Sequence, residues 1–277
     1  MNGLNVLTML SEEYSLLYLD PDKDSLETYR RVVLRGEEPE AKSLARYHGS
    51  IYDRCEEAET PAGNVRVITL GDRSDFELVI RGMSAVKNGP AAPVPPTQGA
   101  ASLTVFNWRK INSHLRQFPR QDRAAEFRRF TSVKDNYLDD LVVLSRDPYS
   151  SVSAADIGSG EQEWIGLSDT IRRYHELTHV ICRRLYPDDI EPACDELIAD
   201  AVGLYAAFGG FDPEKEELFL GIRDGRYIGG RLGIYTDDPE DMIPSVVDRI
   251  RRIREITEAV RGTGPFDMIP VLMEADL

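Results

Sequence analysis

The hydrophobic and polar positions follow different periods before and after a proline-rich segment near residue 90. Asn64–Leu70 reads NVRVITL and alternates as a half-buried strand does. Ser25–Leu34 and Glu38–Glu57 have helical composition, and Phe76–Val86 fits either a helix or a strand. We therefore predict a mixed α/β region over residues 1–87.

Beyond this segment the pattern is mostly helical. Amphipathic helices are predicted at Phe106–Phe118 and Gln121–Phe130, and a short strand at Leu141–Ser145. Longer helices are predicted at Ser168–Leu185, Pro192–Phe208 and Ile243–Val260. Proline suits the first position of a helix and glycine the position after its end, so Pro192 and Gly209 bound the second of these.

The segment between the two patterns, Asn88–Gln98, contains four prolines in NGPAAPVPPTQ. Proline lacks an N–H and continues neither a helix nor a central strand, so we predict a linker or loop over residues 88–102. The expected organisation is a mixed α/β region at 1–87, this linker, and a mainly helical domain at 103–277. The fold class is α+β, mostly helical.

Charge and composition exclude several classes of protein. The chain has 48 acidic and 33 basic residues, a formal net charge of −15, which repels phosphate backbones and anionic membranes. No apolar run reaches the roughly 18 residues of a membrane helix, and the N-terminus lacks the basic start of a signal peptide. Three cysteines without Cys-x-x-Cys spacing indicate a reducing compartment. We expect a cytoplasmic protein that binds neither nucleic acid nor membranes; its oligomeric state is not indicated.

The chemistry is concentrated in the segment His175-Glu176-Leu177-Thr178-His179. Two histidines four residues apart on a helix differ by roughly 40° around its axis, so both imidazoles can bind one metal ion. Glu176 is offset from His175 by roughly 100°, which suits a general base beside a metal-bound water. In a chain of this composition the pattern arises by chance roughly once in 200 sequences.

The next predicted helix offers a third ligand. Glu196 and Asp200 lie one turn apart on it, among apolar neighbours, and the chain between the two helices is long enough to return Glu196 to the histidines. Asp200 is then placed to accept the second N–H of a ligating histidine. The turn that this requires is predicted at 186–189.

HELTH followed by Glu-x-x-x-Asp on a downstream helix resembles the gluzincin metallopeptidases, of which the thermolysin-like enzymes are familiar members. The resemblance covers His175 to Gly209. It implies a zincin-like metal-site domain with a small sheet, a zinc ion on His175, His179 and Glu196, Glu176 as general base, and Asp200 as the partner of His175.

No histidine follows His179, so another group must stabilise the oxyanion in a hydrolase. The glycine-rich stretch 221–233 offers Arg231 and Tyr227, with Tyr235 behind them, because glycine allows close approach and Arg and Tyr donate to oxyanions. We predict Arg231 and Tyr227 as catalytic residues. The alternative is a hairpin with ordinary surface residues.

The leading hypothesis is a zinc-dependent hydrolase of a peptide or amide bond, with Glu176 as the base that deprotonates water. Two histidines and one carboxylate also form the facial triad of Fe²⁺ oxygenases, in which Arg231 would bind the carboxylate of a 2-oxoacid. A third alternative is a non-catalytic metal-binding module. Dependence on oxygen and 2-oxoglutarate would separate the first two.

Overall fold

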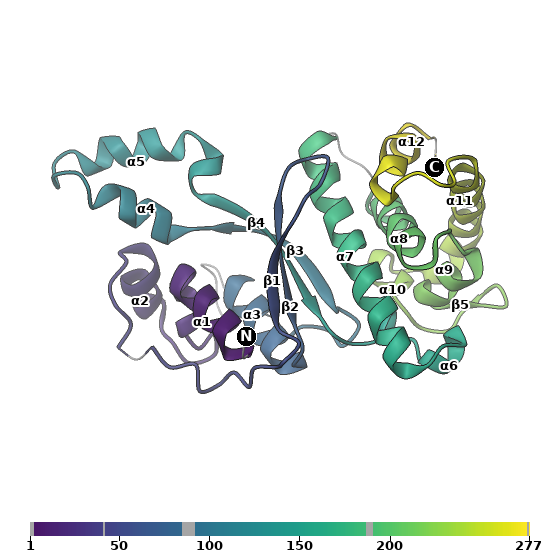
Figure 1. Cartoon of the computed structure of the whole chain (residues 1–277), viewed down its shortest axis with the longest axis horizontal. Helices are drawn as coiled ribbons and strands as arrows, with labels where there is room; N and C mark the ends of the chain where they lie inside the picture. Colours follow the sequence, from purple (N-terminus) through teal and green to yellow (C-terminus); the bar gives the residue numbers. More distant parts are fainter. Residues whose placement is uncertain (1–2, 41, 85–91, 187–190, 276) are drawn as a thin grey trace. The chain divides into compact units, whose positions relative to one another are not determined.

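The structure is a computed structural model that describes residues 3–40, 42–84, 92–186, 191–275 and 277 (Figure 1). The chain forms two compact units. Unit 1 comprises residues 1–56, 66–94 and 103–143, and unit 2 comprises residues 57–65, 95–102 and 144–277. The predicted turn at 187–189 and the first residues of the predicted linker, 88–91, lie outside the described residues.

Most residues of a four-stranded sheet belong to unit 1. Its strands are β1 (Arg54–Ala58), β2 (Val65–Leu70), β3 (Ala100–Phe106) and β4 (Leu138–Ser145), in the order β1-β2-β4-β3 (Figure 1). The inner strands carry consecutive buried residues, including Val142 and Val143 of β4 at 0% exposure. Such a run is typical of a strand covered on both faces.

Short helices complete unit 1. The α-helices are α1 (Gly3–Glu13), α2 (Leu26–Tyr29), α3 (Arg73–Ser84), α4 (Trp108–Leu115) and α5 (Arg123–Thr131). A π-helical turn, η2 (Arg30–Leu34), continues α2, and the 3₁₀ turns are η1 (Ser15–Tyr18) and η3 (Lys134–Asn136). The strands predicted near residues 64–70 and 141–145 are confirmed, and the ambiguous segment from Phe76 is helical.

The helix predicted over Glu38–Glu57 is wrong. The described residues of this segment, 38–40 and 42–57, form a loop with turns at 45–46 and 51–52 that leads into β1. Its backbone N–H groups bind carboxylates instead of helical carbonyls: Asp75 accepts from His48 at 2.9 Å and Gly49 at 2.7 Å, and Asp53 accepts from Ser50 at 2.9 Å. Side-chain acceptors of this kind compete with the helix for the same donors.

Unit 2 is almost entirely helical. Its α-helices are α6 (Ala154–Ile157), α7 (Glu161–Leu185), α8 (Pro192–Phe208), α9 (Pro213–Leu220), α10 (Leu232–Tyr235), α11 (Pro239–Ala259) and α12 (Ile269–Glu274). The 3₁₀ turns η4 (Tyr149–Ser151) and η5 (Pro265–Met268) and a hairpin of β5 (Ile222–Arg223) and β6 (Arg226–Tyr227) join them.

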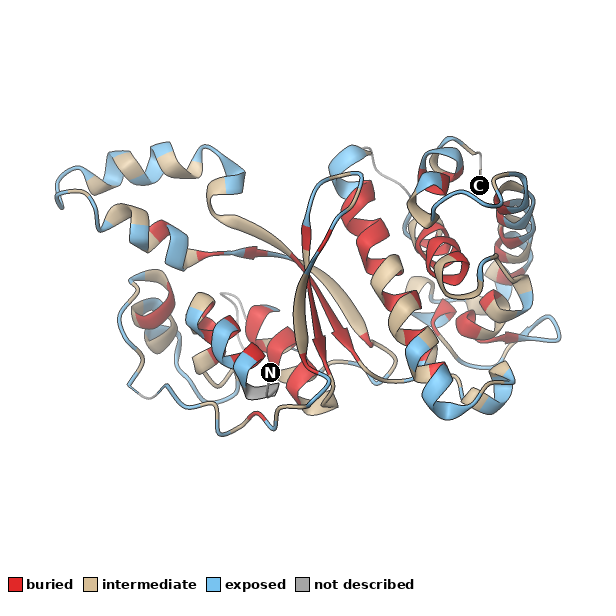
Figure 2. Cartoon of the chain, viewed as in Figure 1, coloured by how far each residue is buried: buried red, intermediate tan, exposed pale blue. Residues whose placement is uncertain are grey.

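Helices α7 and α8 pack against each other more extensively than any other pair of helices in unit 2, and Figure 2 shows their buried residues. They approach closely because Gly203 has no side chain: a Cβ there would lie 2.8 Å from the carbonyl oxygen of Ile171. The predicted bounds of α8 are confirmed, with Pro192 at its first turn and Gly209 in the left-handed conformation after its end. Helix α7 ends at Leu185 as predicted but begins seven residues earlier, at Glu161.

The predicted fold class, α+β and mostly helical, is confirmed. Residues 92–99 form a loop as predicted, whereas residues 100–102 already belong to β3. Residues 103–143 group with the N-terminal part of the chain, so unit 2 continues uninterrupted only from residue 144. The chain also passes from unit 1 to unit 2 between residues 94 and 95, within the proline-rich segment. Among the described residues, no helix is both long and apolar enough to cross a bilayer.

Candidate metal centre

Helix α7 buries both histidines of the HELTH segment on one face. His175 is 6% and His179 9% exposed, and their Nε2 atoms lie 3.0 Å apart. The four-residue spacing puts the rings one above the other, with their planes nearly perpendicular at 83°. Both Nε2 atoms therefore face the same small volume.

Glu196 of α8 contributes a carboxylate to the same volume. Its Oε2 lies 3.4 Å from His175 Nε2, and its Oε1 lies 3.6 Å from His179 Nε2. Ligand atoms bound tetrahedrally at about 2.1 Å are separated by roughly 3.4 Å, so the spacing fits a Zn²⁺-sized ion. His175, His179 and Glu196 thus form a group that could hold a metal, as the sequence predicted.

The other nitrogen of each ring binds an aspartate. Asp200 accepts from His175 Nδ1 at 2.7 Å, as predicted, and Asp195 lies 2.8 Å from His179 Nδ1. Along α8 the partner of the second histidine, Asp195, precedes the partner of the first, Asp200, as two antiparallel helices require. With Nδ1 protonated, each ring presents the lone pair of Nε2 to a metal. Asp195 is not among the residues predicted from the sequence, although its position next to Glu196 was the available signal.

Asp200 is fully buried and makes a second set of contacts that the sequence did not predict. Both Nη atoms of Arg231 donate to its carboxylate, and Tyr149 donates from its hydroxyl at 2.5 Å. Arg231 Nη1 also donates to the Tyr149 hydroxyl at 2.5 Å. Arg231 therefore lies beside the site as predicted, but its positive charge is neutralised by an ion pair with Asp200.

Tyr149 reaches this position through a short turn after β4. Ser150 and Ser151 both have positive φ, 50° and 59°, which side-chain-bearing residues adopt only under constraint. The Tyr149 N–H donates to the buried Ser168 hydroxyl of α7 at 2.9 Å, which fixes the turn to the site helix. No motif in the sequence signals this residue.

The charges around the site favour a cation at its centre. Burial would lower the pKa of His175, but Asp200 and Glu196 raise it to about 10. Burial would raise the pKa of Glu196, but its hydrogen bond to His175 and the nearby charges lower it to about 2. The negative potential that stabilises a proton on His175 also stabilises a metal ion on Nε2.

A further carboxyl group lies behind Asp200. Glu216 of α9 is fully buried, and burial first and the charge of Asp200 second raise its pKa well above the ordinary value. Both causes favour the protonated form of Glu216, and Arg231 forms its ion pair with Asp200.

Three further side chains, those of Glu176, Tyr235 and Cys182, are not part of the ligand group. Glu176 is buried at 8% exposure and follows His175 directly on α7. Tyr235 of α10 donates its hydroxyl to Glu196 Oε2 at 2.9 Å. Cys182, one turn beyond His179, packs in the core with its Sγ 4.0 Å from Met273 Sδ.

The structure does not bring the predicted Tyr227 to the metal ligands. Its hydroxyl donates to the carbonyl of Gly230 at 2.9 Å and accepts from the N–H of the same residue at 3.0 Å. Here the glycines serve backbone packing: a Cβ at Gly221, which has a φ of 84°, would lie 2.5 Å from the Gly229 carbonyl oxygen. The hairpin alternative thus describes β5 and β6, and the segment after it carries Arg231 and Tyr235 to the site.

A second group with metal-ligand atoms, His48, Asp72 and Asp75, lies in unit 1. Its carboxylates already bind backbone: Asp75 accepts from His48 and Gly49, and Asp72 accepts from the N–H of Asp75 at 3.1 Å. These contacts hold the loop before β1 against the start of α3. The centre in unit 2 is therefore the stronger candidate.

Comparison with known proteins matches one family, described as "Family of unknown function (DUF7005)", over residues 22–252. Neither the curated proteins nor the solved structures gave a match to the chain. The matched residues include His175, Glu176, His179, Glu196 and Arg231, so the family covers the metal centre and most of both units. The chain belongs to the DUF7005 family.

Proposed function

We propose that this protein is a metal-dependent hydrolase, with zinc as the metal and a peptide or amide bond as the substrate. The observation that supports this best is the convergence of His175 Nε2, His179 Nε2 and the Glu196 carboxylate at 3.0–3.6 Å. Aspartates fix the other nitrogens of both rings, a feature typical of metal-binding histidines.

A zinc ion held by these three residues would polarise a carbonyl and lower the pKa of a bound water toward about 7. Three protein ligands, rather than four, are the number that catalytic zinc sites use. The buried thiol of Cys182 packs against Met273 and adds no fourth ligand. The donor set therefore fits a catalytic zinc ion.

Glu176 is the proposed general base. It would accept a proton from the attacking water and return it to the leaving amine. It follows His175 directly on α7, and its low exposure, 8%, keeps it largely out of bulk water. A module that only holds a metal has no need of a buried carboxylate here.

Tyr235 is the proposed donor to the oxyanion, in place of Tyr227. Its hydroxyl is within 2.9 Å of a ligand oxygen of Glu196, so a substrate oxygen beside that ligand would be within reach. Arg231 has a different proposed role. Because both of its Nη atoms bind Asp200, it holds the partner of His175 in place.

The iron oxygenase alternative uses the same three ligands, and the metal identity separates it from the hydrolase. In that alternative Arg231 would bind a 2-oxoacid carboxylate. Both Nη atoms of Arg231 already donate to Asp200 or Tyr149, so fewer of its N–H groups remain for such a ligand. This favours the hydrolase.

The test is a hydrolysis screen of peptide and N-acyl amide mixtures by mass spectrometry in ¹⁸O-labelled water. We expect incorporation of ¹⁸O into a new carboxylate by the wild-type protein. We expect a loss of about 10²–10⁴-fold in rate for Glu176→Gln at unchanged metal content. Glu161→Gln, an exposed substitution at the start of the same helix, serves as the matched control and should retain full activity.

Full activity of Glu176→Gln would contradict the assignment of the base. A metal-loaded wild-type protein that hydrolyses no substrate in the screen would favour the non-catalytic module. Oxygen consumption that depends on 2-oxoglutarate would favour the oxygenase.

A further inference from the structure

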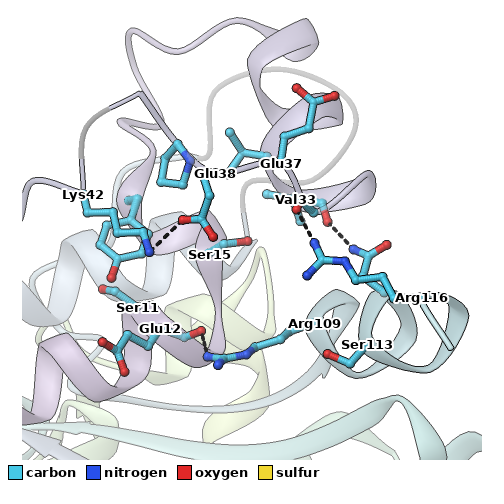
Figure 3. Close-up of a pocket in the computed structure, with 15 residues that line it drawn as sticks. Ser11, Glu12, Ser15, Val33, Glu37, Glu38, Lys42, Arg109, Ser113 and Arg116 are labelled. Atoms are coloured by element: carbon cyan, nitrogen blue, oxygen red, sulfur yellow. Dashed lines mark hydrogen bonds and ion pairs between the residues drawn. The ribbon is translucent and has the colours of Figure 1, made fainter.

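Unit 1 contains a cavity of about 370 Å³ between α1, the segment from η2 to Lys42, and α4 (Figure 3). Its volume is in the range of small-molecule sites, roughly 300–1,000 Å³. Its lining is mainly polar, and all of its residues belong to one unit. The metal centre of unit 2 contributes nothing to it.

One face of α4 supplies the positive charge. Arg109, Asn112, Ser113 and Arg116 follow the i, i+3, i+4, i+7 spacing of a single helical stripe, and all four line the cavity. Arg109 donates to the carbonyl oxygen of Glu12, and Arg116 Nη2 donates to that of Gly36 at 2.6 Å. Within the part of the chain that the structure describes, neither guanidinium pairs with a carboxylate.

Both guanidiniums belong to a chain with 48 acidic residues against 33 basic ones, so the acidic residues near the cavity bear on its charge. The other charges at the cavity are largely neutralised. Lys42 pairs with Glu38 at 2.7 Å, and Glu37 lies 3.7 Å from Arg31. The lining thus carries three basic side chains, Lys42, Arg109 and Arg116, and three acidic ones, Glu12, Glu37 and Glu38. Lys42 and Glu38 pair with each other, whereas the two guanidiniums pair with no carboxylate among the described residues.

The backbone is shaped so that the arginines keep their positions. Gly36 has a φ of 64°, and a Cβ there would lie 3.1 Å from Arg116 Nη2 and 2.9 Å from Asn112 Nδ2. Asn112 Nδ2 also donates to the Val33 carbonyl oxygen at 3.3 Å. The wall of the cavity is thus set by specific contacts between α4 and the segment after η2.

A buried hydroxyl lies at the base of the same cavity. Ser11 of α1 is 0% exposed, lines the cavity, and its Oγ has no hydrogen-bond partner among the described residues. Burying a hydroxyl without a partner costs free energy, which a ligand oxygen would recover. Ser15 and Ser113 line the same cavity (Figure 3).

We propose that this cavity binds a small anionic molecule with a carboxylate or phosphate head and a polar body. Arg109 and Arg116 hold the head, since guanidinium matches both oxyanions in a bidentate manner. The hydroxyls of Ser11, Ser15 and Ser113 contact the polar body. A nucleic acid or an anionic membrane does not fit, because the net charge of −15 repels both.

The test is isothermal titration calorimetry of the full chain with inorganic phosphate, glycerol 3-phosphate and L-glutamate, each used separately at low ionic strength. We expect at least one of them to bind. Comparing the affinities of the two phosphate compounds with that of L-glutamate shows whether the site prefers a phosphate or a carboxylate group. The double variant Arg109→Gln/Arg116→Gln should weaken that binding at least tenfold, and Arg120→Gln, an exposed arginine outside the cavity, should leave it unchanged.

Ser11→Ala supplies a readout that a structural role would not give. Removing an unpartnered buried hydroxyl should leave the Tm unchanged or raise it, while affinity for the probe falls severalfold. Two results would overturn the proposal: absence of binding by all three probes, or binding that the double arginine variant retains. The second result would assign the probe to another site, such as the metal centre.

Discussion

The candidate metal centre of unit 2 and the cavity of unit 1 use charged residues in opposite ways. At the centre, Asp200 is fully buried and binds His175, Arg231 and Tyr149 at once. At the cavity, Arg109 and Arg116 are exposed, and their bonds to the protein go to backbone carbonyl oxygens. At the first site the charges pair within the protein, and at the second two guanidiniums pair with no carboxylate among the described residues.

The difference reflects what each site requires. Metal ligands must be held at fixed distances, so the residues that orient them are packed and hydrogen-bonded before the ion binds. An anion site needs charge that is not already neutralised, so its arginines are held by neutral acceptors. The comparison predicts that substitution of a fully buried residue at the centre, such as Asp200, lowers both stability and metal affinity, whereas substitutions at the cavity lower ligand affinity alone.

The largest expected effect on stability comes from Asp200→Ala. It leaves the guanidinium of Arg231 buried without its carboxylate, which destabilises a protein by about 3–5 kcal/mol. Urea unfolding of wild type and variant measures the difference. The double variant Asp200→Ala/Arg231→Met should recover part of it. A loss below about 1 kcal/mol in the single variant would show that the two residues are not coupled as described.

Asp195→Ala should separate metal affinity from stability. Asp195 orients His179 through Nδ1, so its loss should weaken metal binding by about 10–100-fold. Its side chain is 31% exposed and binds no buried cation, so the free energy of unfolding of the metal-free protein should change little. Competition with a chromogenic chelator measures the affinity. Unchanged affinity would mean that Asp195 does not position His179.

The smallest effect is expected at Asp139 in unit 1. This residue does not line the cavity, and its negative charge is stabilised by neighbouring hydrogen-bond donors. It accepts hydrogen bonds from Tyr14 and Asn107, each at 2.7 Å, and from Lys110 at 2.5 Å. Burial alone would raise its pKa, but the bonds to Lys110, Asn107 and Tyr14 lower it. Asp139→Asn should therefore cost about 1–2 kcal/mol at pH 7.

This cost should depend on pH in a defined direction. A carboxyl whose folded pKa is depressed stabilises the fold above its unfolded pKa of about 3.9, and that contribution is lost as pH falls through the folded pKa. The difference in unfolding free energy between wild type and Asp139→Asn should thus shrink between pH 5 and pH 2. A difference that stays constant over this range would contradict the assigned origin of the shift.

The predictable parts of the site were those encoded locally. The four-residue spacing of His175 and His179, the spacing of Glu196 and Asp200, and the terminators Pro192 and Gly209 all act within one or two helical turns. They predicted the two helices and the three residues that converge. The zinc ion, the role of Glu176 and the hydrolase activity remain predictions.

The parts of the fold and site that the sequence did not predict depend on contacts between segments far apart in the chain. Tyr149 reaches Asp200 across 51 positions, and Arg231 across 31. Tyr227 was chosen for its chemistry, but the hairpin turns its hydroxyl onto Gly230. The helix expected over Glu38–Glu57 failed because Asp75, a residue outside that segment, captures its N–H groups. The cavity combines α1, η2 and α4, and no local pattern marks it.

The most direct test of the central claim is the metal content of protein purified without added metal or chelator. We expect about one equivalent of zinc in the wild type, lost in both His175→Ala and Glu196→Ala and retained in Glu161→Gln. One equivalent of iron would move the assignment to the oxygenase. No metal in the wild type, even after reconstitution with zinc or iron, would contradict the account of His175, His179 and Glu196 as a metal centre.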